Sequence, residues 1–65
     1  MIFHTTEVKR LRESRGMTQQ QLAALIGMND SEICRIENGD RNPLATTAAR
    51  LAKAFDVPIE HLVHE

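Results

Sequence analysis

Residues that end helices constrain the fold of this 65-residue chain more than any other feature. Gly16, Gly27, Gly39, Pro43 and Pro58 divide the chain into short segments. Within the segments, apolar residues recur at the three- and four-residue spacing that places them on one face of a helix. The alternating apolar and polar pattern of strands is absent, and so are Gly-rich hairpin turns. The sequence therefore predicts an all-α fold.

Five helices are expected from these segments. Their predicted ranges are about 6–15, 18–26, 29–38, 44–55 and a last short helix that begins after Pro58. Thr18 and Gln21 fit a capping box at the start of the second helix, and Asn29 with Glu32 repeats this pattern at the third. The apolar stripe of the second helix is expected to face the core and consists of Leu22, Leu25 and Ile26.

Composition excludes several function classes. Eight Lys and Arg stand against nine Asp and Glu, for a formal net charge of −1, so affinity for a polyanion must come from a local patch. With two Phe and no Trp or Tyr, stacking on single-stranded nucleic acid is not expected as the main activity. A lone cysteine, Cys34, excludes an internal disulfide and a four-cysteine zinc site. Without a signal peptide or an apolar run of ~20 residues, a cytoplasmic location is expected.

The second and third predicted helices form the most informative pair. Only Gly27 and Met28 separate the second helix from the cap at Asn29, so the two helices must cross steeply, as in a helix-turn-helix. Glycine suits this turn because the left-handed conformation costs other residues energy. The spacing alone leaves a second interpretation open, since many small helical bundles contain a tight glycine turn.

The residues themselves add a family resemblance that covers about residues 6 to 63. The chain closely resembles the Cro/C1-type helix-turn-helix family of small phage repressors and bacterial regulators in Met17-Thr18-Gln19-Gln20-Gln21-Leu22-Ala23, Gly27-Met28-Asn29, Ile33-Cys34-Arg35-Ile36-Glu37-Asn38-Gly39, Arg41-Asn42-Pro43 and Leu51-Ala52-Lys53-Ala54-Phe55. The resemblance implies one five-helix, lambda-repressor-like domain over residues 1–65, with the helix-turn-helix at about 18–38. It also implies binding to duplex DNA, with the third helix in the major groove.

The resemblance carries individual contacts over to this chain. Gln19 is similar to a phosphate-contacting Gln at the start of the second helix. Positions that face DNA in the family hold Asn29, Asp30, Ser31, Cys34 and Arg35, and further backbone contacts are implied for Asn38 and Arg41. A semi-buried salt bridge between the first helix and the end of the third is implied for Arg12 and Glu37, with two solvated surface residues as the alternative. Asp56 stands where the family often has a helix-ending Gly.

The helical wheel supports this assignment independently. If Ile33 and Ile36 face inward, Ser31, Cys34, Arg35 and Asn38 share the opposite face. Arg35 is the best candidate to read a base, because its guanidinium can bond O6 and N7 of guanine together, although it can also bind a phosphate. Asp30 and Glu32 can instead stabilise the helix dipole. Cys34 is open to three interpretations: a thymine contact, a redox role or a simple filler.

The expected function is sequence-specific binding of double-stranded DNA by a transcriptional regulator, a repressor, that acts as a homodimer on a palindromic operator. The dimer contact is assigned to Ile59, Leu62 and Val63, and the alternatives are packing of these residues on Phe55 and Leu51 or a dimer through Ile2-Phe3. The second hypothesis is a protein-binding module of the same fold, such as an antitoxin subunit or phage-encoded modulator, supported by Asp30 and Asp40. A metal or redox protein would depend on His61, His64 and Cys34 alone, which are too few ligands. Neither an enzyme nor a cofactor is expected.

Overall fold

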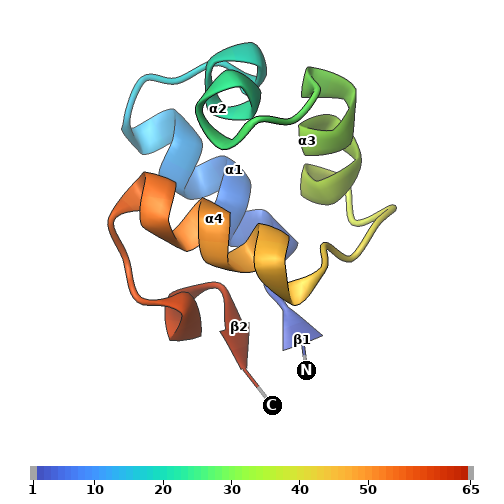
Figure 1. Ribbon diagram of the computed structural model, residues 1–65, viewed down its shortest axis with the longest axis vertical. Helices are drawn as coiled ribbons and strands as arrows, with labels where there is room; N and C mark the ends of the chain where they lie inside the picture. The colour runs from blue at the N-terminus through green and yellow to red at the C-terminus, as the bar shows by residue number, and fades with distance from the viewer. Residues whose placement is uncertain (1, 65) are drawn as a thin grey trace.

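The computed structural model describes residues 2–64 and consists of four α-helices, one 3₁₀ turn and a two-stranded ribbon (Figure 1). In chain order the elements are β1 (Ile2–Phe3), α1 (Thr5–Ser14), α2 (Gln19–Ile26), α3 (Asp30–Glu37), α4 (Ala45–Phe55), the 3₁₀ turn (Ile59–His61) and β2 (Val63–His64). The four long helical segments expected from the sequence are present, and each of their ends lies within one residue of the expected one. The fifth predicted helix is not.

The segment after Pro58 corrects the five-helix prediction. It makes one 3₁₀ turn and then continues as β2, which pairs antiparallel with β1 so that Phe3 lies opposite Val63. The amide of His4 also donates to the carbonyl of Leu62 at 2.7 Å. A helix of so few residues is not stable without tertiary support. Here the N-terminal segment lies beside the C-terminal one and offers strand pairing instead (Figure 1).

One apolar core lies between the helices and the C-terminal segment. Its buried members are Val8, Leu11, Leu22, Ala23, Ile26, Ile33, Ile36, Ala48, Leu51, Ala52, Phe55, Leu62 and Val63. The inward stripe predicted for α2 is wrong at one position, because Leu25 is 60% exposed and Ala23 is buried in its place. The face of α2 that meets its neighbours is thus turned by a fraction of a helical turn from the expected one, and a large apolar side chain is left on the surface.

Side-chain hydrogen bonds cap the start of α2 but not that of α3. The Thr18 hydroxyl accepts from the backbone N–H of Gln21 at 3.0 Å, and the Gln21 side chain accepts from the N–H of Thr18 at 2.8 Å, which confirms the predicted capping box. Asn29 occupies the corresponding position before α3, yet its side chain makes no capping hydrogen bond. The predicted second capping box is therefore wrong, although Asn29 has the extended backbone of an N-cap residue.

Asp56 ends α4 in a left-handed conformation, with φ 58° and ψ 45°. Non-glycine residues pay for this conformation and glycine does not, so we expect Asp56→Gly to raise the free energy of unfolding by roughly 0.5–1 kcal/mol. In a domain of this size that corresponds to an increase in melting temperature of about 2–8 °C, measurable by thermal circular dichroism. Asp40→Gly is the control, since Asp40 does not have a positive φ and should gain nothing. A lower melting temperature for Asp56→Gly would contradict the prediction.

Candidate nucleic-acid interface

The geometry of α2 and α3 presents one face of α3 to solvent. A three-residue connection joins the helices, and Gly27 begins it with φ 73°. The amide of Met28 donates back to the carbonyl of Ala23 at 2.8 Å, which closes the end of α2. Ile33 and Ile36 are fully buried against the rest of the molecule. The opposite face of α3 is uncovered at the edge of the fold (Figure 1).

Most of the side chains expected to contact DNA lie on or next to this uncovered face. Exposed residues are Asn29, Asp30, Ser31, Arg35, Asn38 and Arg41, and Cys34 and Gln19 are half-buried. In the described part of the chain, the guanidinium groups of Arg35 and Arg41 have no ion-pair or hydrogen-bond partner. They are therefore available to a phosphate or a base edge.

Cys34 is held by its neighbour one helical turn later. The side-chain amide of Asn38 lies 3.5 Å from the Cys34 sulfur, within hydrogen-bond distance for sulfur. Cys34 is half-buried and Asn38 is exposed. The two side chains therefore lie next to each other on the outer face of α3.

A buried ion pair connects the first helix to the end of α3. Arg12 donates through Nε to Glu37 Oε2 at 2.7 Å and through Nη2 to Glu37 Oε1 at 3.1 Å. The two side chains are only 10% and 3% exposed. Arg12 also donates to the carbonyl of Met17 at 2.7 Å, in the connection before α2. The hydrogen bond to Glu37 is the largest cause of the raised pKa of Arg12, so the guanidinium stays charged.

Gln19 belongs to the same network, a connection that the sequence did not reveal. Its side-chain amide donates to Glu37 Oε1 at 3.1 Å. An amide nitrogen carries two hydrogens, so one donor remains for an outside acceptor such as a phosphate. Because Glu37 is itself held by Arg12, the orientation of Gln19 is set by a group on another helix. The pairing crosses 18 residues of sequence, and no local pattern reports it.

Acidic groups surround the start of α2 and limit the electrostatic attraction for a polyanion. Glu13 and Asp30 line the hollow beside Gln19, and Asp40 is exposed just after α3. An anion that approaches this region therefore meets carboxylates as well as Arg35 and Arg41. Attraction must come from specific hydrogen bonds and these two guanidinium groups, because the overall field of the molecule is weak.

The C-terminal residues assigned to a dimer contact are placed differently from the expectation. Leu62 is fully buried and Val63 nearly so, both inside the core of the single chain. The 3₁₀ turn and the pairing of β2 with β1 carry these two side chains under α4, where the core also holds Leu51 and Phe55. A dimer contact made by Leu62 and Val63 does not fit this burial. Ile59 packs on the core but stays half-exposed.

His61 contacts a carboxylate and makes no metal cluster. Its Nε2 lies 3.1 Å from Glu7 Oε2, and Arg10 donates to the same oxygen at 2.7 Å. Within the described residues, no group of three or more His, Cys, Asp or Glu side chains is arranged to hold a metal ion. The His64 side chain lies outside the described part. In that part, too, no helix has the length and apolar character needed to cross a membrane.

The Glu7 carboxylate predicts a specific acid dependence of stability. Its hydrogen bond from Arg10 is the largest cause that lowers the pKa of Glu7 below the ordinary value of 4.5, and His61 adds to the effect. A carboxylate whose pKa is lower in the folded state than in the unfolded state stabilises the protein at pH values above the unfolded-state pKa. This stabilisation is lost as the pH falls through the folded-state pKa. We expect the free energy of unfolding, measured with urea, to fall less steeply between about pH 5 and pH 2 in Glu7→Gln than in the wild type.

The matched control for Glu7→Gln is Glu60→Gln. This exposed acid of the 3₁₀ turn has no ion pair in the region that the structure describes. Its substitution should leave the pH dependence of the free energy of unfolding below pH 5 as in the wild type. Identical curves for Glu7→Gln and Glu60→Gln would show that the Arg10 and His61 contacts add nothing to stability.

Comparison with known sequences identifies relatives over nearly the whole chain. A family model described as helix-turn-helix matches residues 8–62. The HTH-type transcriptional repressor RghR of Bacillus subtilis is 40% identical over 60 residues, which are 91% of this chain and 44% of RghR. An uncharacterized HTH-type transcriptional regulator of Archaeoglobus fulgidus is 35% identical over 57 residues, 88% of this chain and 81% of that protein. This chain thus spans less than half the length of RghR.

Solved structures show the same arrangement of helices. The restriction-modification controller protein C.AhdI from Aeromonas hydrophila superposes with a TM-score of 0.85 at 30% identity, covering 91% of this chain and 89% of that one. Bacillus thuringiensis PlcR, in complex with the peptide PapR7 and DNA, superposes with a TM-score of 0.80 at 37% identity over 88% of this chain and 20% of PlcR. With the family model matching residues 8–62, the protein belongs to the helix-turn-helix family of the Cro/C1 type.

Proposed function

We propose that the protein is a transcriptional regulator that binds duplex DNA through α2 and α3. In this proposal α2 and α3 are the helix-turn-helix of a single domain over residues 1–65, and α3 lies in the major groove. The observation that carries it is the position of Arg35 on the outer face of α3, opposite the buried Ile33 and Ile36. Its guanidinium has no ion-pair or hydrogen-bond partner within residues 2–64. RghR is a repressor and PlcR was solved with DNA, and both resemble this chain.

Each residue of the predicted DNA-contacting set has a proposed role. Arg35 reads guanine through two parallel hydrogen bonds, and Ser31 contacts the neighbouring base. Gln19 donates its remaining amide hydrogen to a phosphate, and Asn38 and Arg41 contact the backbone beyond α3. Asn29, Asp30 and Cys34 are the remaining side chains placed against the DNA. Asp30 is the one group in this set that repels phosphate, and it therefore restricts how closely the first turn of α3 approaches the strand.

We further propose that two copies bind a palindromic operator. One small module touches few base pairs, and the net charge of −1 adds no general attraction, so specific affinity requires a second copy. Two recognition helices would then lie one DNA turn apart, about 34–36 Å. The surface proposed for the dimer is the end of the molecule where β1 and the 3₁₀ turn lie (Figure 1). Ile2 is 56% exposed and Ile59 is half-exposed there.

Binding-site selection with random duplex DNA tests the proposal, and Arg35→Ala tests the reading of sequence. We expect Arg35→Ala to weaken binding to the selected site by ~1–3 kcal/mol and to relax preference at one base position.

Gln19→Ala should weaken binding to all sequences evenly. Because Gln19 is neutral, that variant should keep the salt dependence of the wild type. Both affinities are measured by fluorescence anisotropy at several salt concentrations.

Lys9→Ala provides the matched control for the loss of one positive charge. Lys9 is exposed on α1 and does not contribute to α3. Its substitution should leave the base preference unchanged. If Arg35→Ala loses affinity equally on the selected site and on random DNA, Arg35 is a phosphate contact and not a base reader.

A protein-binding module of the same fold is the second candidate, and the acidic groups favour it. Asp30, Asp40 and Glu13 lie around the surface proposed for DNA. An antitoxin subunit or a phage-encoded modulator would use this surface on a protein with basic groups. Selection that enriches no duplex sequence, together with folded protein by circular dichroism, would favour this candidate over the first.

A further inference from the structure

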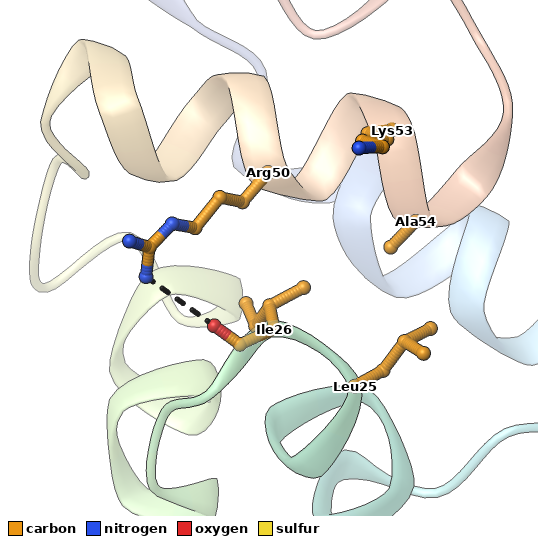
Figure 2. Close-up of a pocket in the computed structure, with 5 residues that line it drawn as sticks. All are labelled: Leu25, Ile26, Arg50, Lys53 and Ala54. Carbon is orange, nitrogen blue, oxygen red and sulfur yellow. Dashed lines mark hydrogen bonds between the residues drawn. The ribbon is translucent and has the colours of Figure 1, made fainter.

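A shallow groove lies between the end of α2 and the second half of α4, and the DNA-binding proposal does not use it (Figure 2). Leu25 and Ile26 of α2 and Arg50, Lys53 and Ala54 of α4 line it, around a volume of about 470 Å³. None of these five residues belongs to the set proposed to contact DNA. We call this feature the α2–α4 groove.

The apolar part of the α2–α4 groove includes one large exposed side chain, that of Leu25. Leu25 faces Ala54 across the gap, and its side chain is 60% exposed (Figure 2). Three of the five lining residues are apolar. A single exposed apolar residue is ordinary on a protein surface, so the case for a contact site depends on the charged groups beside Leu25.

The α4 side of the groove is positively charged. Arg50 and Lys53 line it, and no Asp or Glu does. Neither cation has an ion pair among the residues that the structure describes. One nitrogen of Arg50 lies 3.5 Å from the carbonyl of Ile26, which holds the guanidinium across the groove and leaves its other donors available (Figure 2).

The groove is too open to enclose a small molecule. Binding pockets for small ligands cover most of the ligand surface with walls on several sides. Here two helices provide all the lining residues, and solvent has access along the groove. A longer occupant that lies across the surface fits this shape, as in the recognition of peptide segments by helical grooves.

We propose that the α2–α4 groove binds a short acidic segment of a partner protein. A bulky apolar side chain of the segment packs on Leu25 and Ala54, and flanking carboxylates pair with Arg50 and Lys53. Charge complementarity supports this occupant, because the groove offers apolar surface, no acid, and two cations that form no ion pair with any described residue. A basic or neutral segment leaves both cations without partners. None of the residues that line the groove comes from α3, so a partner in the groove leaves the outer face of α3 available for DNA.

Selection from a phage-displayed library of random short peptides on the immobilised full chain tests this proposal. We expect enriched peptides with a large apolar residue flanked by Asp or Glu. Synthetic copies should bind about tenfold or more weakly to Leu25→Ser and to Lys53→Glu, as for residues central to an interface. Amide chemical shifts in nitrogen-15-labelled protein should move at Leu25, Ile26 and Ala54.

Two matched variants control for general changes in surface character. Leu44→Ser removes another exposed leucine, 69% exposed at the start of α4, and Lys9→Glu reverses another exposed lysine. Both should bind the peptides as the wild type does. The proposal is overturned if enriched peptides lack acidic residues, if none are enriched, or if Leu25→Ser binds them unchanged. It is also overturned if Lys53→Glu weakens DNA binding clearly more than Lys9→Glu does, or if sedimentation shows that Leu25→Ser dissociates a dimer.

Discussion

Arg12→Ala is expected to lower the free energy of unfolding by ~3–5 kcal/mol, because it leaves the nearly buried Glu37 carboxylate without its charged partner. Three hydrogen bonds are lost with the guanidinium, two to Glu37 and one to the Met17 carbonyl. Domains have about 0.05–0.15 kcal/mol of stability per residue, so a loss of this size unfolds much of the population of a 65-residue chain. Urea unfolding followed by circular dichroism measures it.

Two further variants test whether the loss of stability comes from the unpaired Glu37 charge or from the loss of side-chain contacts in general. Arg10→Ala removes another α1 arginine whose ion pair with Glu7 is exposed, and its effect should be far smaller. Arg12→Met combined with Glu37→Met removes both charges, and it should recover most of the stability lost in Arg12→Ala. An unchanged melting temperature for Arg12→Ala, or a double variant less stable than the single one, would refute this account.

Leu62→Ala is expected to lower the free energy of unfolding by ~2–5 kcal/mol. Leu62 follows the 3₁₀ turn, is fully buried, and forms part of the same core as Phe55 and Leu51. Truncation leaves a cavity that the packed helices cannot fill. It also weakens the anchoring of the backbone at this position, where the carbonyl of Leu62 accepts a hydrogen bond from the amide of His4. Thermal unfolding of the two proteins at equal concentration gives the difference.

Ile59→Ala is the control for Leu62→Ala, because Ile59 precedes it in the same segment but is only half-buried. It should cost clearly less stability.

Sedimentation of the same two variants adds a second measurement, the strength of the proposed dimer. Since Leu62 is inside the single chain, Leu62→Ala should change stability and not the strength of a dimer, whereas a weaker dimer in Ile59→Ala supports the proposed dimer surface. Equal stability of Leu62→Ala and the wild type would show that the C-terminal segment does not close the core.

Helices and their ends could be predicted because they depend on neighbouring residues. The reciprocal bonds of Thr18 and Gln21 join residues three apart, and Gly27 reaches its positive φ without a steric cost. The same local rules misjudged Asn29, whose backbone has the N-cap conformation while its side chain makes no cap. A residue type that favours a cap does not determine which hydrogen bond its side chain makes.

Local sequence patterns were enough to predict α1 to α4, the short connection between α2 and α3, and the outward position of Arg35, since helical periodicity and helix-ending residues operate over a few positions. Three further features depend on how the helices pack in three dimensions. The segment after Pro58 became a 3₁₀ turn and a strand because the N-terminal residues lie beside it. Leu25 stayed exposed because Ala23 takes the closer position in the core. Gln19 is oriented by Glu37 across 18 residues. Each depends on groups distant in sequence, which only the packing of the helices brings together.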